Sequence, residues 1–91
     1  MKLKKVIGGK FTTKQANQDL MATVDDGIEN NVLLLTNVSI CNMGDNEINV
    51  IINGGTRIPI DANEILSLED LVVGSIIVVE QGSTVKFLGL C

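Results

Sequence analysis

The side chains of this sequence that could do chemistry are carboxylates, lysines and two cysteines, because its 91 residues include no histidine. Catalytic triads, cysteine–histidine pairs and histidine-based metal sites are therefore excluded. The carboxylate pairs Asp25-Asp26 and Glu69-Asp70 stand beside turn residues, where acidic side chains are usually solvated rather than engaged in proton transfer. Cys41 and Cys91 are too far apart in the sequence for the closely spaced motifs of zinc or disulfide sites.

The short polar motifs supply no recognisable binding chemistry either. IGGK, at residues 7–10, has glycines and a lysine but not the spacing of a phosphate-binding P-loop. GDNE and DANE, at residues 44–47 and 61–64, carry oxygen ligands without the spacing of a calcium-binding EF-hand, so turn formation explains them better. We therefore expect no enzymatic activity, no cofactor and no metal site.

Basic and acidic residues are separated along the chain. The net charge is −4, yet five of the seven basic residues precede the first acidic residue: Lys2, Lys4, Lys5, Lys10 and Lys14. A basic arm thus precedes an acidic body, and it can act as an electrostatic strap onto an acidic partner or simply as a solvated terminus. Nucleic acid is the less favoured partner, since the arm has no arginine and the chain has neither tryptophan nor tyrosine.

Residues 1–30 also differ from the rest in their apolar pattern. Four apolar residues recur there at a helix-like spacing: Ala16, Leu20, Met21 and Val24. Thr12 and Gln15 have the spacing of a helix capping box, and Gly27 could end the helix. An extended arm that becomes ordered on a partner fits equally well, because a helix this short is marginal in water. We expect a basic N-terminal arm over residues 1–30 and a domain over residues 31–91.

From Asn31 onward, short apolar segments alternate with turn residues. The pattern predicts six or seven strands, spaced roughly eight to twelve residues apart. Asn53-Gly54-Gly55 supplies the positive φ angles of a tight hairpin. Pro59 cannot donate a ladder hydrogen bond, so its strand lies at a sheet edge or presents that position outward. The apolar runs on either side of residues 80–83 predict a closing hairpin. We expect an all-β fold, a small antiparallel β-sandwich or jelly-roll-like barrel with an N-terminal arm.

Three of the predicted strands carry apolar residues on both alternating faces, at residues 33–35, 50–52 and 76–79. In the first of these strands, the alternation assigns Leu34, Thr36 and Val38 to one face. A sandwich this small has one interior, so the second faces would form patches that soluble monomers rarely tolerate. We therefore expect subunit contacts in a homo-oligomer about a cyclic axis, with a trimer favoured.

The sequence contains no membrane-spanning or secretory pattern. No apolar run approaches the roughly 20 residues of a transmembrane helix. The apolar stretch that follows the first lysines stops after Val6-Ile7, which is too short for a signal peptide. We expect no membrane contact and synthesis in a reducing cytoplasm.

The segment INVIINGGTRIPIDANEILSLEDLVVGSIIVVEQGSTVKFLG, residues 48–89, resembles a group of small structural proteins from the virions of tailed bacteriophages. The shared pattern is a strand, an NGG-type turn, a PI.A.E...L.DL segment and a closing hairpin that ends in GSTVKF.G, and the resemblance extends over residues 31–89. It implies a β-sandwich that decorates or cements a capsid or tail, usually as an oligomer whose N-terminal arm reaches across neighbouring subunits. The pattern carries no catalytic residues.

Together these features predict a capsid decoration or cement protein of the virion, made in the host cytoplasm, that binds the major capsid protein or another virion protein. The candidate partner-binding residues all lie in the arm: Lys2, Lys4, Lys5, Lys10, Phe11, Leu20 and Met21. On this hypothesis the lysines bind an acidic capsid surface, while residues 11–24 dock or become ordered on contact. The alternatives are a location in the tail, neck or fibre base, and a host-surface carbohydrate-binding module, against which the lack of tryptophan and tyrosine counts.

Overall fold

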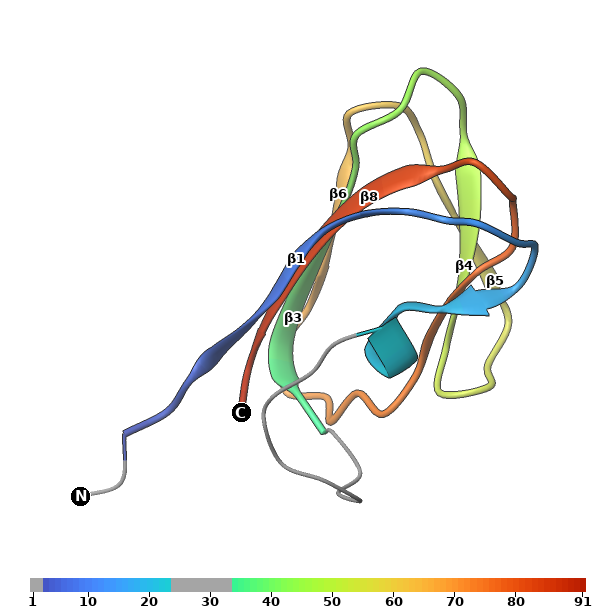
Figure 1. Cartoon of the computed structure of the whole chain (residues 1–91). Helices are drawn as coiled ribbons and strands as arrows, with labels where there is room; N and C mark the ends of the chain where they lie inside the picture. The colour runs from blue at the N-terminus through green and yellow to red at the C-terminus, as the bar shows by residue number, and fades with distance from the viewer. Residues whose placement is uncertain (1–2, 24–33) are drawn as a thin grey trace.

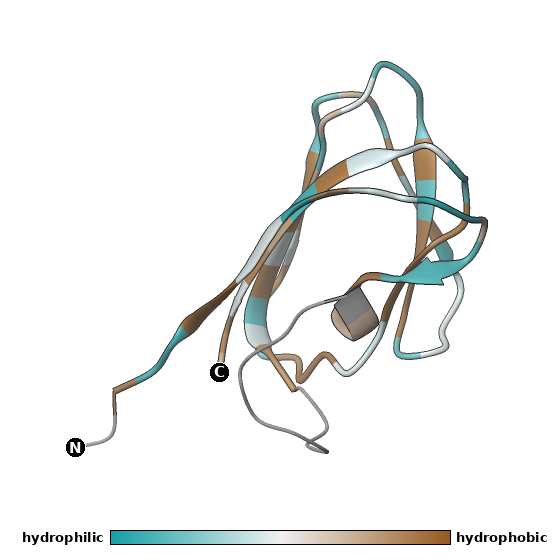
Figure 2. Cartoon of the chain, viewed as in Figure 1, coloured by the Kyte–Doolittle hydropathy of each residue, from teal (hydrophilic) through white to brown (hydrophobic). Residues whose placement is uncertain are grey.

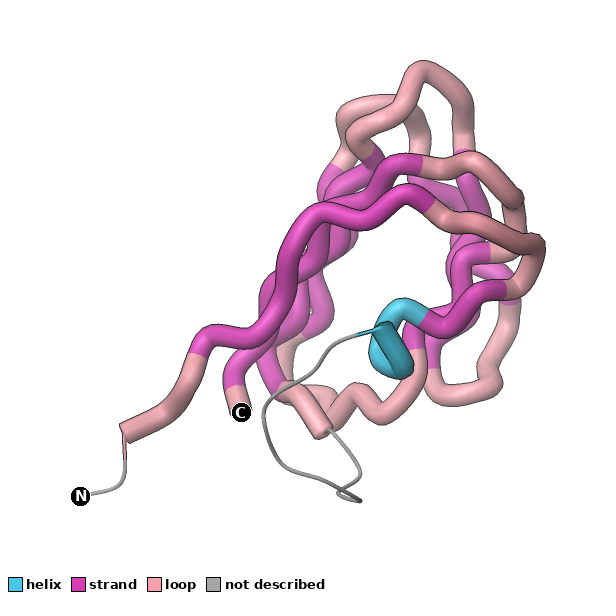
Figure 3. Tube along the Cα trace, in the orientation of Figure 1, coloured by secondary structure: helices cyan, strands magenta, loops and turns pink. Residues whose placement is uncertain are grey.

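The chain is built from short strands joined by turns. The computed structural model describes residues 3–23 and 34–91, coloured by secondary structure in Figure 3. In chain order the elements are β1 (Val6–Thr12), β2 (Gln18–Asp19), the 3-10 helical turn η1 (Leu20–Thr23), β3 (Thr36–Asn42), β4 (Ile48–Ile52), β5 (Arg57–Ile60), β6 (Ile65–Leu68), β7 (Ile76–Val78) and β8 (Thr84–Leu90). Residues 34–91 thus contain six strands, as the sequence predicts.

The strands form two four-stranded antiparallel sheets that pack face to face (Figure 1). Sheet A has the strand order β1-β8-β3-β6, and sheet B has the order β2-β7-β4-β5. The predicted all-β sandwich is confirmed. Pro59 lies in β5, an edge strand of sheet B, as expected for a residue that cannot donate a ladder hydrogen bond.

The strand pairing is that of a jelly roll. β1 pairs with β8, β2 with β7, β3 with β6 and β4 with β5, all antiparallel, so the chain is a long hairpin rolled into two layers. The hairpin folds back between β4 and β5, where Asn53 and Gly54 have φ angles of 52° and 73° and the Gly55 N–H donates to the Ile52 carbonyl at 2.9 Å. Two successive positive φ angles are the requirement of a type I′ turn, which the Asn-Gly pair meets.

The expected closing hairpin is wrong in its pairing. β7 and β8 follow one another in sequence, but they belong to different sheets. β7 already has β2 on one side and β4 on the other, so no edge is left for β8. Thr13 fixes the crossing: its hydroxyl donates to the Glu80 carbonyl at 2.8 Å and accepts from the Ser83 N–H at 2.9 Å.

A β-bulge in β3 reverses the expected facing of Leu34 and Leu35. Leu35 is fully buried and Leu34 is exposed, although simple alternation puts Leu34 on the same face as Val38. The pairing register of β3 with β8 shifts between Thr36 and Ser39, and Asn37 has a φ of 51°. The extra residue brings Leu35 and Val38 to the same face.

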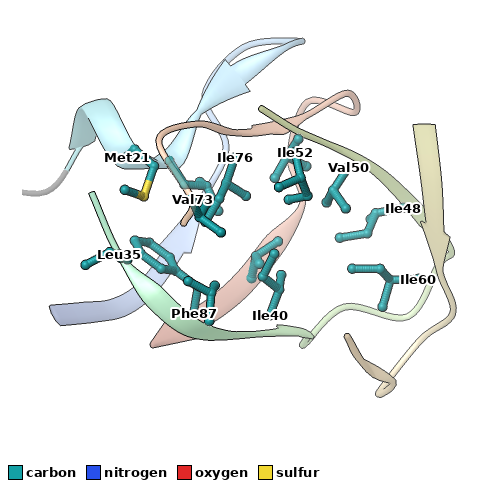
Figure 4. Close-up of a cluster of buried hydrophobic side chains, with 14 residues drawn as sticks. Met21, Leu35, Ile40, Ile48, Val50, Ile52, Ile60, Val73, Ile76 and Phe87 are labelled. Carbon is teal, nitrogen blue, oxygen red and sulfur yellow. The ribbon is translucent and has the colours of Figure 1, made fainter. Parts of the chain in front are cut away.

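The core lies between the sheets and consists of aliphatic residues around one phenylalanine (Figure 4). Its buried hydrophobic members are Leu20, Met21, Leu35, Val38, Ile40, Ile48, Val50, Ile52, Ile60, Val73, Ile76, Val78, Val85 and Phe87. Figure 2 shows hydrophobic and hydrophilic segments alternating along the strands that enclose this core. Such alternation is what a sheet with one buried face requires.

Residues 6–23, which were expected to be part of an N-terminal arm, are instead part of the sandwich. β1 pairs with β8 along all seven of its residues, and residues 18–23 supply β2 and η1. Thr12 ends a strand rather than capping an α-helix, and Gly27 lies outside the described residues. Gly8 permits the close approach of β1 to β8, because a Cβ there would collide with the Phe87 carbonyl oxygen.

Candidate functional site

The structure separates the lysines predicted to bind a partner from the apolar residues predicted with them. Lys2 lies outside the described residues, whereas the side chains of Lys4, Lys5 and Lys10 are exposed. Lys5 also extends the β1–β8 ladder, because its backbone exchanges hydrogen bonds of 3.0 and 2.9 Å with Cys91. Lys10 stands on the outward side of β1.

The predicted apolar contacts face the interior instead. Leu20 and Met21 are core residues, with 0% and 5% of their surface exposed. Phe11 is half-buried and stacks on Phe87, with ring centroids 5.5 Å apart. Leu20 and Met21 begin η1, which contacts β7, and both side chains belong to the core between the sheets. In this structure, therefore, neither side chain is free to meet a partner.

One end of the sandwich is held by a buried asparagine. Asn42 is fully buried at the end of β3, and its Nδ2 donates to the Ile60 carbonyl at 3.0 Å and to the Asn46 carbonyl at 2.7 Å. Its Oδ1 accepts from the Gly44 N–H at 3.0 Å. Asn42 thus connects sheet A to the end of β5 in sheet B and shapes the turn between β3 and β4.

A carboxylate is fixed beside this end on sheet B. Both oxygens of Glu80 accept from the Asn49 N–H, at 2.9 and 3.1 Å, and Oε1 also accepts from Asn49 Nδ2 at 2.8 Å. Burial raises the pKa of Glu80, but these hydrogen bonds and the attraction of Arg57 outweigh it, so the pKa lies below its ordinary value of 4.5. An ionised, hydrogen-bonded Glu80 is suited to holding β4 rather than to transferring protons.

These turns enclose a polar cleft of about 400 Å³, lined by residues 42, 44–48 and 80–84. Within the described ranges, no cluster of three or more cysteines and carboxylates could hold a metal ion. No buried side-chain nitrogen or oxygen in the same residues lacks a hydrogen-bond partner. The buried polar side chains beside the cleft, such as Asn42, are therefore hydrogen-bonded within the chain.

The outer face of sheet A, defined as the solvent side of β1, β8, β3 and β6, has a different composition. The strand register places Lys10, Lys86, Cys41 and Ile65 in one row across the four strands. Leu88 occupies the next row, between Gly8 and Ser39. None of the four strands contains an aspartate or a glutamate. Lysine and apolar side chains therefore share this face without an acidic residue on the strands.

The apolar side chains of this face are well exposed. Val6 and Ile65 expose 67% and 65% of their surface, while Met43 and Leu88 expose about two fifths. Lys86 and Leu88 join Ser39, Cys41, Met43 and Ile65 in lining a shallow groove of about 250 Å³. The outer face of sheet A thus combines a groove with mostly apolar walls and two lysines beside it.

The other strands predicted to carry apolar residues on both faces are less exposed than expected. Ile51, Ile77 and Val79, on the outer side of sheet B, are half-buried rather than exposed. Leu33 lies outside the described residues. The most exposed apolar residues are instead near the N-terminus, on β6 and before β7: Leu3, Val6, Ile65 and Val72.

Sequence reasoning missed the contribution of β8, β3 and β6 to this face. Val85 and Phe87 point inward, so alternation alone would have placed Lys86 and Leu88 outward. Alternation within one strand could not predict that Lys86 and Leu88 lie near Lys10 and Ile65, because that proximity depends on which strands pair.

Comparisons with protein-family models, with curated proteins and with solved structures found no match. Among residues 3–23 and 34–91, no helix has the length and apolarity to cross a membrane.

Proposed function

We propose that this protein is a structural component of a tailed-phage virion, a capsid decoration or cement protein that binds the lattice of the major capsid protein. The proposal draws on the resemblance of residues 31–89 to small virion proteins. It also fits the jelly-roll fold, an architecture that recurs in viral coat proteins and in lectins. Because one fold hosts many functions, the fold alone does not choose between these roles.

The observation that carries the proposal is the outer face of sheet A. Its exposed apolar residues and unpaired lysines lie together on a rigid sheet, as expected of a surface that becomes covered in an assembly. The ordered polar groups elsewhere, such as Asn42 and Glu80, are occupied in holding turns and strands. Binding to other subunits is therefore the role that the described surface supports best.

The attachment differs from the long strap expected from the sequence. Since β1, β2 and η1 belong to the sandwich, deleting residues 1–24 would remove an edge strand and two core residues. We propose that attachment uses the sheet face together with the short basic segment before β1. A truncation that tests the basic segment should therefore end before Val6.

The experiment is to locate the protein in purified virions. Mass spectrometry of particles, and of heads separated from tails, should detect the chain in both preparations, and immunogold label should cover the heads. Detection only in tails, necks or fibres would replace the capsid by one of those sites. Absence from all particles would overturn the proposal.

Its oligomeric state can be measured on the isolated protein. We expect sedimentation equilibrium to show a homo-oligomer with closed cyclic symmetry, and a trimer is the state that we favour. A monomer at all concentrations would contradict self-association and would leave the lattice as the only cover for the exposed face.

A further inference from the structure

We propose that the outer face of sheet A is a docking face for a protein surface that presents a carboxylate flanked by apolar side chains, with Lys10 and Lys86 binding that carboxylate together. The identity of the partner rests on the proposed function. The chemistry of the face does not depend on it, because it follows from strand register, charge and exposure.

The first step is the geometry of the two lysines. Lys10 and Lys86 are direct partners in the antiparallel β1–β8 ladder. Lys5 and Cys91 exchange both backbone hydrogen bonds and therefore form a hydrogen-bonded pair. Hydrogen-bonded and non-hydrogen-bonded pairs alternate along an antiparallel ladder, so Ile7, Gly9 and Phe11 are also in hydrogen-bonded pairs with β8. By this alternation Lys10 and Lys86 form a non-hydrogen-bonded pair, the kind that brings opposing side chains closest.

The second step is the missing counter-charge. Like charges placed directly opposite each other destabilise a sheet. Among the described residues, no carboxylate forms an ion pair with either lysine. Glu64 directly precedes Ile65 of the same face, but its carboxylate accepts from the Asp61 N–H at 2.9 Å within its own turn. A partner's carboxylate placed between the two ammonium groups would remove the repulsion and gain two charge-assisted hydrogen bonds.

The third step is the apolar surround, which selects the class of partner. The lysine pair borders the 250 Å³ groove that Met43, Ile65 and Leu88 line. A partner surface therefore needs apolar side chains next to its acidic residue. Nucleic acid is a poorer match, because sheet A has no arginine in its strands and its two phenylalanines, Phe11 and Phe87, face inward.

This assignment gives the molecule an orientation in the assembly. Sheet A faces the partner, whereas sheet B, whose outer apolar residues are half-buried, faces solvent. Electrostatic attraction by the lysine pair should make docking faster and dependent on ionic strength.

The test uses the full-length chain labelled with nitrogen-15 and the synthetic peptide acetyl-SLSESLS-amide, whose leucines and glutamate share one side when extended. Amide shifts should change for Ser39, Cys41, Ile65, Lys86 and Leu88. The matched peptides acetyl-SLSQSLS-amide and acetyl-SLSKSLS-amide should bind about tenfold more weakly. Equal binding of the glutamate and glutamine peptides would overturn the carboxylate site. Stronger binding of a single-stranded oligothymidylate at the same residues would assign the face to nucleic acid instead.

Variants identify the residues responsible. The double substitution Lys10→Gln and Lys86→Gln should weaken binding of the glutamate peptide about tenfold. The control Lys14→Gln with Arg57→Gln removes the same charge from other parts of the surface and should leave binding unchanged. Equal losses in both variants would show a general charge effect and would contradict a site at the lysine pair.

Lysine footprinting on virions separates this inference from the proposed function. If the chain coats heads through sheet A, Lys10 and Lys86 should be protected from acetylation there, while Lys14 stays as reactive as in the free protein. Protection of Lys14 alone would contradict the orientation while leaving the capsid location intact. Conversely, a chain that is absent from particles but binds the glutamate peptide through the lysine pair would overturn the function and keep the site.

Discussion

The outer faces of the two sheets differ in how their polar side chains are paired. On sheet B, Asn49 and Glu80 hydrogen-bond to each other, and Arg57 lies close enough to attract the carboxylate. On sheet A, Lys10 and Lys86 stand opposite each other, and no carboxylate of the described residues forms an ion pair with either of them. The first face is complete within one chain, whereas the second gains from a partner. This difference is the basis on which we propose sheet A as the docking side of the sandwich.

The two outer faces belong to one body only while the sheets stay joined. Among the proposed variants, we expect substitution of Asn42 to lower the free energy of unfolding most. Asn42→Ala leaves the Ile60 and Asn46 carbonyls and the Gly44 N–H without their partner. We expect a loss of roughly 2–4 kcal/mol in the free energy of unfolding, measured by urea denaturation. Asn46→Ala is the control, since only its backbone carbonyl is used, and a similar loss there would contradict this role.

The next largest effect is expected where sheet A accommodates its bulge. A Cβ at Gly89 would lie 2.9 Å from Leu35 Cβ and 3.0 Å from Val38 Cγ2. Gly89→Ala should therefore cost about 1–3 kcal/mol through overpacking, again measured by urea denaturation. Gly44→Ala is the matched control, because its nearest contact, Asn42 Oδ1, is 3.5 Å away. If both variants are equally stable, the bulge has more room than the structure indicates.

A smaller, pH-dependent change in the free energy of unfolding is expected on sheet B, where Glu80 accepts hydrogen bonds from Asn49. At neutral pH, Glu80→Gln should lower the free energy of unfolding by about 1–2 kcal/mol, because ionised Glu80 accepts three bonds from Asn49 and is partly exposed. The folded-state pKa of Glu80 lies below its ordinary value of 4.5. Its contribution is therefore fully present above pH 4.5 and is lost as the pH falls through the lowered pKa.

Thermal or urea unfolding of both proteins across this pH range measures that effect. The wild-type and Glu80→Gln proteins should converge at low pH, where both side chains are neutral. Glu69→Gln, at an exposed position, should follow the wild-type curve throughout. A constant difference between wild type and Glu80→Gln at every pH would contradict a role for the ionised form.

The smallest effect on stability is expected on sheet A. Lys10→Gln with Lys86→Gln should change the free energy of unfolding by no more than about 0.5 kcal/mol, and in the stabilising direction, since a like-charge pair is removed. The change should shrink in high salt. Clear destabilisation would mean that the two lysines are satisfied within the chain, and the contrast between the two faces would disappear.

Much of the fold was readable from local patterns. Alternation located the six strands after residue 34, Asn53-Gly54 predicted a tight hairpin turn, and an edge position was one of the two placements that Pro59 allowed for its strand. These features depend on φ preferences, missing donors and side-chain period, which are properties of residues and their nearest neighbours. Lys4, Lys5 and Lys10 were likewise identified as exposed basic residues by the charge pattern alone.

The candidate site was only half visible in the same way. The sequence marked Lys10 but grouped it with Leu20 and Met21, which the structure buries in the core. It did not mark Lys86, which is distant in sequence and opposite Lys10 in space. The double-faced apolar runs pointed to exposed patches on central strands, yet the described members of those runs on sheet B are half-covered.

By itself, then, the sequence determined the strand content of residues 34–91, the tight turn and the separation of positive from negative charge. Tertiary structure decided that β7 and β8 join different sheets, that residues 6–23 complete the sandwich, and that Lys10, Lys86, Leu88 and Ile65 share one face. The physical reason is that pairing between distant strands is set by the shared core and by the edges left free, and neither is encoded in any single segment.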